Sequence, residues 1–292
     1  MSLLAALVLG YCFVMLPAWF AAELWAARPG ARSGVRLGAL WGGRALALAG
    51  VGWGVAAFAF ASGGLWGDLA ELWRTYYPEL LRGYGATIVL TLLSFALALV
   101  VGGIAALLRT SEFRALRFAS GVYIEWFRNT PLLIQLFFWF FGVPRLDLLL
   151  IGRPDWFLLS PWHASIIGLT CYTGAYTAEA FRSGLLAVDR GQPEAARSLG
   201  LSYLQTRLHV VGPQALRVAV PLLTSIFSAL FRNSALCSAI GLTELLRASL
   251  NVGEETFKTY EALALASVLY LSLTLPLAFA SSRLERRVTR HA

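Results

Sequence analysis

Charged residues are scarce in this chain of 292 residues, at 14% of the total, whereas 58% are hydrophobic. Soluble domains carry about 25% charged residues. Apolar runs of roughly 20 residues, the length of a bilayer-spanning helix, recur along the whole sequence. No polar stretch is long enough for a soluble domain. The composition therefore predicts an all-α polytopic membrane protein, because a span in lipid must satisfy its own backbone hydrogen bonds.

Sequence features of several enzyme and metal-protein classes are missing. The three cysteines, Cys12, Cys171 and Cys237, lie far apart in apolar segments, which argues against a disulfide framework or a CxxC metal pair. The three histidines have no metal-ligand spacing. No GxxxxGK[ST] motif occurs, which excludes ATP hydrolysis by a P-loop in this chain. The first apolar run lacks the basic region of a secretory signal, so we expect it to be retained as a span.

The apolar runs predict seven spans, at about residues 3–26, 44–62, 84–108, 118–143, 162–183, 218–240 and 260–282. Between the second and third spans, one face of a helical wheel is apolar: Leu65, Leu69, Leu72 and Trp73. This pattern predicts a short amphipathic helix over 62–85 that lies along the outer membrane surface.

Basic residues are distributed unequally between the loops. Of the 24 Arg and Lys residues, sixteen fall in alternate loops and the tail, six fall in the other loops, and Arg128 and Arg232 lie in or beside spans. Lys and Arg are enriched in cytoplasmic loops. We therefore expect a periplasmic N-terminus, a cytoplasmic C-terminus and a cytoplasmic segment 189–213. The net charge of +8 is explained by topology and indicates no nucleic-acid partner.

The segment 189–213 is polar and separates two very apolar spans. Pro193 suits the first turn of a helix, where Glu194 complements the helix dipole. One narrow face of this short helix is apolar: Ala195, Ala196 and Leu199. The residues alone allow two interpretations, a docking surface for another subunit or an ordinary amphipathic helix on the membrane surface.

A glycine elbow is expected after this helix. Gly200 is the usual left-handed residue that stops a helix. Ser202 and Gln205 have the spacing of a capping box, which begins a second helix. Pro213 is expected to end that second helix.

Polar side chains inside the fourth and fifth spans are costly unless they face a cavity or a partner. Six of them are candidates: Glu125, Arg128, Asn129, Thr130, Gln135 and Glu179. Glu125 and Arg128 are one turn apart and are predicted to pair. Pro131 is expected to loosen the fourth span. Two interpretations remain for these residues, a ligand path or a structural role in which Glu125 and Arg128 form a brace and Glu179 bonds across helices.

Four stretches together resemble one family. "EAARSLG" followed by "VVGP" resembles the EAA signature of ABC-importer permeases, with Val210 and Gly212 as departures. "EWFRNTPLLIQLFF" at 125–138 is similar to a signature of polar amino-acid permeases, and 175–202 and 213–246 match the same family. The chain is thus identified as resembling the permease subunits of type I importers for histidine, glutamine and glutamate.

The resemblance implies a fold, partners and roles. A five-helix type I core would carry two additional N-terminal helices in a bacterial inner membrane. The EAA residues Glu194, Ala195, Ala196, Leu199 and Gly200 would form a coupling helix that docks on a cytoplasmic ABC ATPase dimer. That dimer would bind ATP and Mg, so this chain would hold no cofactor and catalyse nothing itself. A second permease subunit and a periplasmic amino-acid-binding protein would complete the importer.

The resemblance also gives the polar residues of the spans a possible substrate. A zwitterionic amino acid needs donors for its carboxylate, which Arg128, Asn129 and Thr130 offer, and an acceptor for its ammonium group, which Glu179 offers. The alternative function is a secondary amino-acid transporter driven by an ion gradient, with Glu125 and Glu179 in the ion path. A membrane scaffold or sensor is a third reading, against which the absence of a soluble domain argues.

The domain organisation that follows has four parts: an N-terminal helix pair at 1–62, a periplasmic amphipathic linker at 63–82, a permease domain at 83–285 and a cytoplasmic tail at 286–292. The resemblance does not extend to the N-terminal pair, which we expect to pack peripherally against lipid or the partner permease.

Deletion of 1–62 should therefore weaken assembly of the complex more than it changes the preferred substrate. Yield of the assembled complex and uptake of a panel of amino acids measure the two effects. A deletion that switched the substrate while assembly remained intact would contradict the peripheral placement.

Overall fold

The computed structural model describes residues 65–145 and 159–289, and these residues form helices and short connections with no strand among them. The chain divides into two compact units, Met1–Leu72 and Trp73–Ala292. Only 65–72 of the first unit are described, and the other described residues belong to the second. The predicted spans 3–26 and 44–62 lie outside the described residues.

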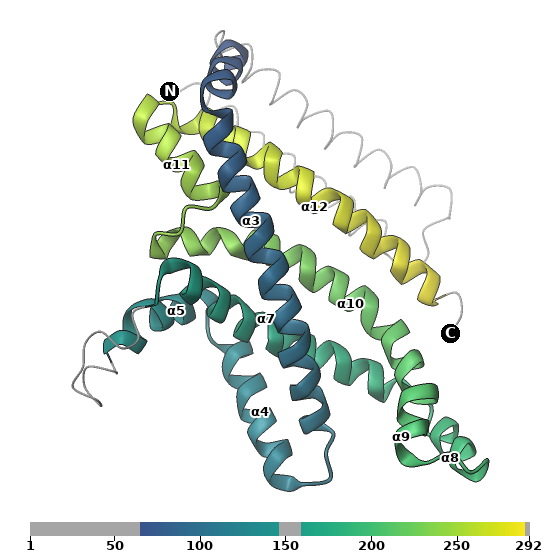
Figure 1. Cartoon of the computed structure of the whole chain (residues 1–292). Coiled ribbons are helices and arrows are strands. Elements are labelled where there is room, and N and C mark those ends of the chain that lie inside the picture. Colours follow the sequence, from purple (N-terminus) through teal and green to yellow (C-terminus); the bar gives the residue numbers. More distant parts are fainter. Residues whose placement is uncertain (1–64, 146–158, 290–292) are drawn as a thin grey trace, which may run out of the picture. The chain divides into compact units, whose positions relative to one another are not determined.

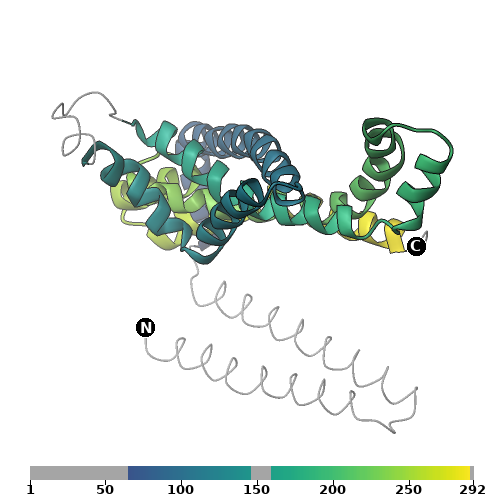
Figure 2. The same cartoon turned by 90° about the horizontal axis from the view of Figure 1, so that it is seen from below.

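The helical elements follow in this order: α3 (Leu65–Arg109), α4 (Arg114–Asn129), α5 (Leu132–Phe137), η1 (Phe138–Gly142), α7 (Pro161–Leu186), α8 (Gly191–Ser198), α9 (Tyr203–Gln205), η2 (Thr206–Val211), α10 (Gly212–Asn233), η3 (Ser234–Ile240), α11 (Leu245–Thr256) and α12 (Thr259–Thr289). In the second unit, α8 and α9 lie where α7 ends and α10 begins, whereas α11 lies at the opposite end (Figures 1 and 2).

The predicted surface helix over 62–85 is not a separate element. α3 is a single helix that includes both this stretch and the predicted span 84–108, with Pro78 inside it. Residues on both sides of Pro78 continue the same helix, so no break separates an amphipathic piece from the span. The prediction of a separate short helix was therefore wrong.

The predicted span 118–143 is interrupted at its proline. α4 ends at Asn129, and both Thr130 and Pro131 have extended backbone conformations before α5 begins at Leu132. The residue before a proline is disfavoured in the helical region, which explains why the helix stops here. The expected effect of Pro131 is confirmed and is stronger than a loosening, because this part of the chain consists of two helices.

Pro213 does not end the helix that follows Gly200, contrary to expectation. Helical structure is continuous over Tyr203–Ile240. The turn before the proline is a wide π turn in which the Gly212 N–H donates to the carbonyl of Arg207, five residues back. A wider turn leaves room for the proline ring, which in a regular α-helix would meet the carbonyl four residues earlier.

A further helix, α11, lies between the last two predicted spans and was not predicted. Its N-cap is Glu244, whose carboxylate accepts hydrogen bonds from the N–H groups of Leu246 and Arg247, both at 3.0 Å. The same fully buried carboxylate accepts from Tyr270 Oη of α12 at 2.6 Å and from Thr87 Oγ1 of α3 at 3.4 Å. Glu244 thus joins α3, α11 and α12.

α7 packs against its neighbours through small residues. Its buried positions are almost all glycine, alanine, serine or threonine: Ala164, Ser165, Gly168, Leu169, Thr170, Thr173, Gly174, Ala175, Thr177, Ala178, Ala180 and Gly184. A Cβ atom at Gly184 would clash with the carbonyl oxygen of Ala215 in α10. Small residues of this kind let helix backbones approach closely, which favours association in a membrane.

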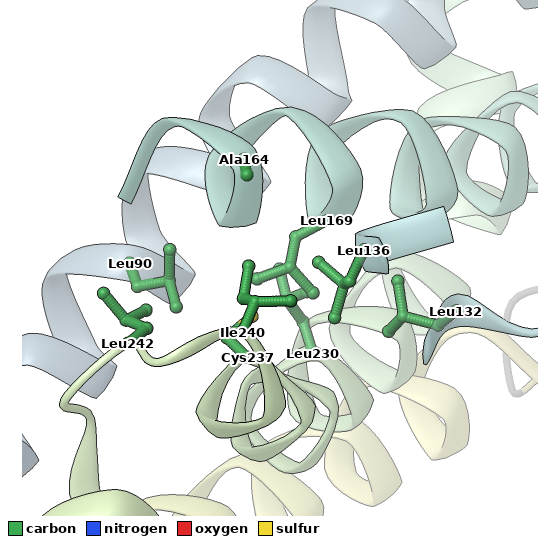
Figure 3. Packing of buried hydrophobic residues seen from close by; sticks show 9 residues of the cluster. All are labelled: Leu90, Leu132, Leu136, Ala164, Leu169, Leu230, Cys237, Ile240 and Leu242. Carbon is green, nitrogen blue, oxygen red and sulfur yellow. The ribbon is translucent and has the colours of Figure 1, made fainter. Parts of the chain in front are cut away.

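Hydrogen bonds and a leucine-rich cluster hold the other helices to α7. Thr177 Oγ1 donates to the Ala98 carbonyl of α3 at 2.9 Å, and Tyr123 Oη of α4 donates to the Cys171 carbonyl at 2.8 Å. Figure 3 shows the buried apolar cluster, to which α3, α5, α7, α10 and η3 all contribute: Leu90, Leu132, Leu136, Ala164, Leu169, Leu230, Cys237, Ile240 and Leu242.

Three helical stretches of the described chain are long and apolar enough to cross a membrane: Gly67–Arg109, Tyr203–Ile240 and Thr259–Ser281. Apolar side chains on α3 and α12 are exposed, including Leu107 at 63% and Phe279 at 65%. This is the arrangement expected when lipid contacts the helix surface. α7 corresponds to the predicted span 162–183, and its many hydroxyl groups agree with a position among other helices.

Gly184→Ala should destabilise the protein by about 1–3 kcal/mol, because the backbone oxygen that meets the new methyl group cannot move away without separating two helices. Gly85→Ala is the matched control. A Cβ at Gly85 meets nothing within 4 Å, so helix propensity alone predicts a gain of roughly 0.5–1 kcal/mol. Unfolding by denaturant in detergent measures both; equal effects of the two variants would contradict the close approach.

Candidate functional site

The short helix α8 begins at Gly191, which places Pro193 in its first turn as expected. Asp189 Oδ1 accepts a hydrogen bond from the Gly191 N–H at 2.7 Å, which satisfies a free donor of the first turn. Glu194 lies in the first turn and is exposed, as the helix dipole favours. The carboxylate is therefore available to a partner molecule.

The predicted apolar face of α8 is divided between two environments. Ala196 is 6% exposed and packs inside the chain, whereas Ala195 is exposed and Leu199 is 82% exposed. The three residues predicted to share one apolar face therefore differ in burial. An outward surface remains that carries Glu194, Ala195 and Leu199.

The glycine elbow forms as predicted. Gly200 has φ +89°, in the left-handed region that favours glycine. Its N–H donates to the Arg197 carbonyl at 2.9 Å, and the Leu201 N–H donates to the Ala196 carbonyl at 3.2 Å. This pair of bonds is a Schellman motif, which fixes the direction of the chain after the helix.

The capping box that begins the next helix is also confirmed. Ser202 Oγ accepts from the Gln205 N–H at 3.3 Å, and Gln205 Oε1 accepts from the Ser202 N–H at 2.8 Å. Two donors of the helix start are therefore satisfied by one pair of residues. Together with the Schellman motif, the box sets the angle between α8 and the long helix that follows.

Sequence reasoning missed a group of aromatic and basic residues inside the elbow. The guanidinium groups of Arg197 and Arg207 lie over the ring of Tyr203, at 5.3 and 5.2 Å from its centroid. These residues border a cavity of about 350 Å³ between α7, α8 and η2. In the sequence, Arg197 precedes and Arg207 follows Tyr203, but only the folded elbow brings their three side chains together.

The predicted pair of Glu125 and Arg128 is not the one that forms. Asn129 Nδ2 donates to Glu125 Oε2 at 2.9 Å and to the Glu125 carbonyl at 2.8 Å. The guanidinium of Arg128 instead lies over the Tyr176 ring of α7, at 5.4 Å from its centroid. An amide one turn along reaches the carboxylate directly, which leaves Arg128 free to bridge α4 and α7.

Gln135 and Thr130 repair the break at Pro131. Gln135 is 5% exposed, and its Nε2 donates to the carbonyls of Phe127 and Thr130, both at 3.0 Å, and to Thr130 Oγ1 at 2.8 Å. Carbonyls freed at a helix break need such partners inside a membrane. These contacts indicate a structural role for the Gln135 amide.

Glu179 forms a tight pair with Arg182, one turn further along α7. The Oε2–Nη2 distance is 2.7 Å, and Arg182 Nε lies within 3.1 Å of both carboxylate oxygens. The expected bond across helices is thus replaced by a bond within one helix. Arg128 of α4 also lies close enough to interact favourably with this carboxylate. The structure therefore brings Arg128, Tyr176 and Glu179 together at the α4–α7 contact.

The part of the chain that the structure describes holds no cluster of His, Cys, Asp and Glu able to bind a metal ion. Cys171 and Cys237 are free thiols.

Comparison with known proteins gives consistent results. Residues 98–290 match the family described as "Binding-protein-dependent transport system inner membrane component". The probable glutamine ABC transporter permease protein GlnM of Bacillus subtilis is 33% identical over 208 residues, which cover 71% of this chain and 92% of that protein. The glutamate transport system permease protein GluC of Corynebacterium glutamicum is 34% identical, with coverage of 75% and 98%.

A solved structure described as "Crystal structure of an amino acid ABC transporter with histidines" shares the fold. It superposes with a TM-score of 0.65 at 31% identity and covers 73% of this chain and 95% of its own. The residues that match the family, 98–290, contain the helices from α4 to α12, with α8 and the elbow among them.

Gly200→Ala should destabilise the elbow by about 1–2 kcal/mol, the cost of a side chain in the left-handed region. A Cβ at this position meets nothing within 4 Å, so the effect is conformational. Gly200→Asn should cost less, because asparagine tolerates this region. Amide hydrogen exchange over 191–211 measures local opening; equal protection in the two variants would contradict the argument.

Proposed function

We propose how this chain, which belongs to the family of binding-protein-dependent transport system inner membrane components, couples ATP hydrolysis by a partner subunit to transport. It is a multi-pass inner-membrane permease subunit of an ABC importer for polar amino acids. The relatives named for glutamine and glutamate transport support this substrate class. The following proposals concern the residues that carry out this role.

α8 and its elbow form the coupling helix that docks on the ATPase. The observation that supports this most directly is the outward surface of Glu194, Ala195 and Leu199, where a leucine is 82% exposed on a helix held at a fixed angle. An exposed large apolar side chain in a polar segment suits a partner's pocket. Gly200 and the capping box hold this surface in a fixed position, so a displacement of α8 would also move the long helix Tyr203–Ile240 that follows.

The importer requires partners. Members of this family work with ATPase and substrate-binding subunits, and we propose a cytoplasmic ATPase dimer, a second permease subunit and a periplasmic amino-acid-binding protein. ATP and Mg bind to the ATPase, so this chain is a non-catalytic subunit. The excess of arginine in alternate loops supports a cytoplasmic position for α8, a periplasmic N-terminus and a cytoplasmic C-terminus.

For the substrate path we propose the α4–α7 contact. Arg128 lies there beside Tyr176 and would meet the carboxylate of a zwitterion. Glu179, which is paired with Arg182 and also interacts with Arg128, would exchange the bond to Arg182 for one to the ammonium group of the substrate. Glu125 and Asn129 bond to each other beside this contact, and Thr130 and Gln135 hold the helix break in place. These four residues would shape the path, whereas Arg128 and Glu179 would contact the charged groups of the substrate.

No observation on the described residues favours an ion-gradient transporter. Its two candidate carboxylates, Glu125 and Glu179, both have side-chain partners. The relatives are named as ABC permeases, which agrees with an ATP-driven cycle.

Glu194→Lys and Leu199→Asp should each reduce co-purification with the cognate ATPase roughly tenfold or more, the effect expected when an interface anchor is lost. ATP-driven uptake in proteoliposomes should fall in parallel. Glu112→Lys is the matched control, because it makes the same charge change at an exposed position of a loop expected on the same side.

The same proteoliposomes, supplied with candidate binding proteins and a panel of polar amino acids, identify the substrate. Survival of both ATPase binding and uptake in the two α8 variants would contradict the coupling role. Uptake driven by an ion gradient without the ATPase would contradict the importer assignment.

A further inference from the structure

The cavity inside the elbow has a strongly basic wall. Three arginines, Arg190, Arg197 and Arg207, line a volume of about 350 Å³ together with one acidic residue, Glu194, which lies at the border between this cavity and the outward surface of α8. A volume of this size lies in the range of small-molecule sites, about 300–1,000 Å³. The excess of positive charge favours an anionic occupant.

The arginines of this wall have no carboxylate partner among the described residues, where the ion pairs are formed by other arginines. Arg197 and Arg207 instead lie over one ring, that of Tyr203. Two cations held at the same ring repel each other, and an anion bound to both would offset that repulsion. Their planar groups are suited to bidentate hydrogen bonds with phosphate or carboxylate oxygens.

The cavity also has an apolar wall: Leu185, Leu186, Val188, Pro193 and Val211. Leu186 is 67% exposed, and on the adjoining turns Leu204 and Leu208 are 64% and 60% exposed. This apolar surface continues from the end of α7, one of the predicted spans. A small inorganic anion would use only the arginines, whereas a lipid would contact both walls.

We propose that this cavity binds the phosphate group of an anionic phospholipid from the cytoplasmic leaflet, with the acyl chains along the exposed leucines. Basic pockets beside spans on the cytoplasmic side bind lipid headgroups in this way. The inference rests on the proposed cytoplasmic position of α8. A bound lipid would fix Arg197 of α8 to Arg207 of η2 and so stabilise the angle of the elbow.

The test uses the full-length chain in nanodiscs of phosphatidylcholine and phosphatidylglycerol, re-extracted and analysed for retained lipid by mass spectrometry. The wild type should retain phosphatidylglycerol over phosphatidylcholine, and Arg197→Gln/Arg207→Gln should retain roughly tenfold less, as expected when two charged contacts are lost. Arg114→Gln/Arg283→Gln removes the same charge at exposed positions outside the cavity and should behave as the wild type. Equal retention in all three proteins would overturn the proposal.

Two further measurements locate the ligand and identify its source. A photoactivatable phosphatidylglycerol should label the wild-type chain within 185–211, and labelling confined to other segments would overturn the proposal even if the glutamine variant did not fold. Equilibrium dialysis with inorganic phosphate should show no binding that depends on the two arginines; such binding without lipid retention would assign the cavity to a free anion. Lipid retention is measured without transport, so its failure leaves the coupling role untouched, and loss of ATPase docking leaves the lipid result untouched.

Discussion

The close approach of α7 to the neighbouring helices is the constraint on which the rest of the second unit depends. Moving an apolar side chain from lipid to a helix interface gains no hydrophobic free energy. Helices in a membrane therefore associate through tight packing and hydrogen bonds. A residue larger than glycine at Gly184 would meet the backbone of α10, and one at Gly102 of α3 would meet Thr177. This contact explains why α7 is rich in small and hydroxyl residues.

Two prolines in this fold have opposite effects for identifiable reasons. At Pro131 the backbone is extended, and the carbonyls left free are bonded by the side chain of Gln135. At Pro213 the preceding turn is widened instead, so the helix continues without a break. The first site therefore has a fixed interruption in the middle of a span, and the second preserves a rigid connection between the elbow and the membrane.

The features predicted from the sequence were those determined by neighbouring residues. Gly200 and the Ser202–Gln205 box involve contacts within a few positions, and their patterns were sufficient. The partner of Glu125 was not predictable, because an arginine and an asparagine compete for it within the same turn. α11 was missed because its N-cap, Glu244, is stabilised by groups from α3 and α12 that are distant in sequence, although a carboxylate in an apolar stretch was a signal that a partner existed.

The continuous helix over Tyr203–Ile240 has a mechanical consequence. It includes the π-helix η2, Pro221 inside α10 and the 3-10 helix η3, and it extends from a contact with α8 to the buried cluster. A displacement of α8 would therefore reach the core leucines through one helical segment, with no loop between them to absorb it.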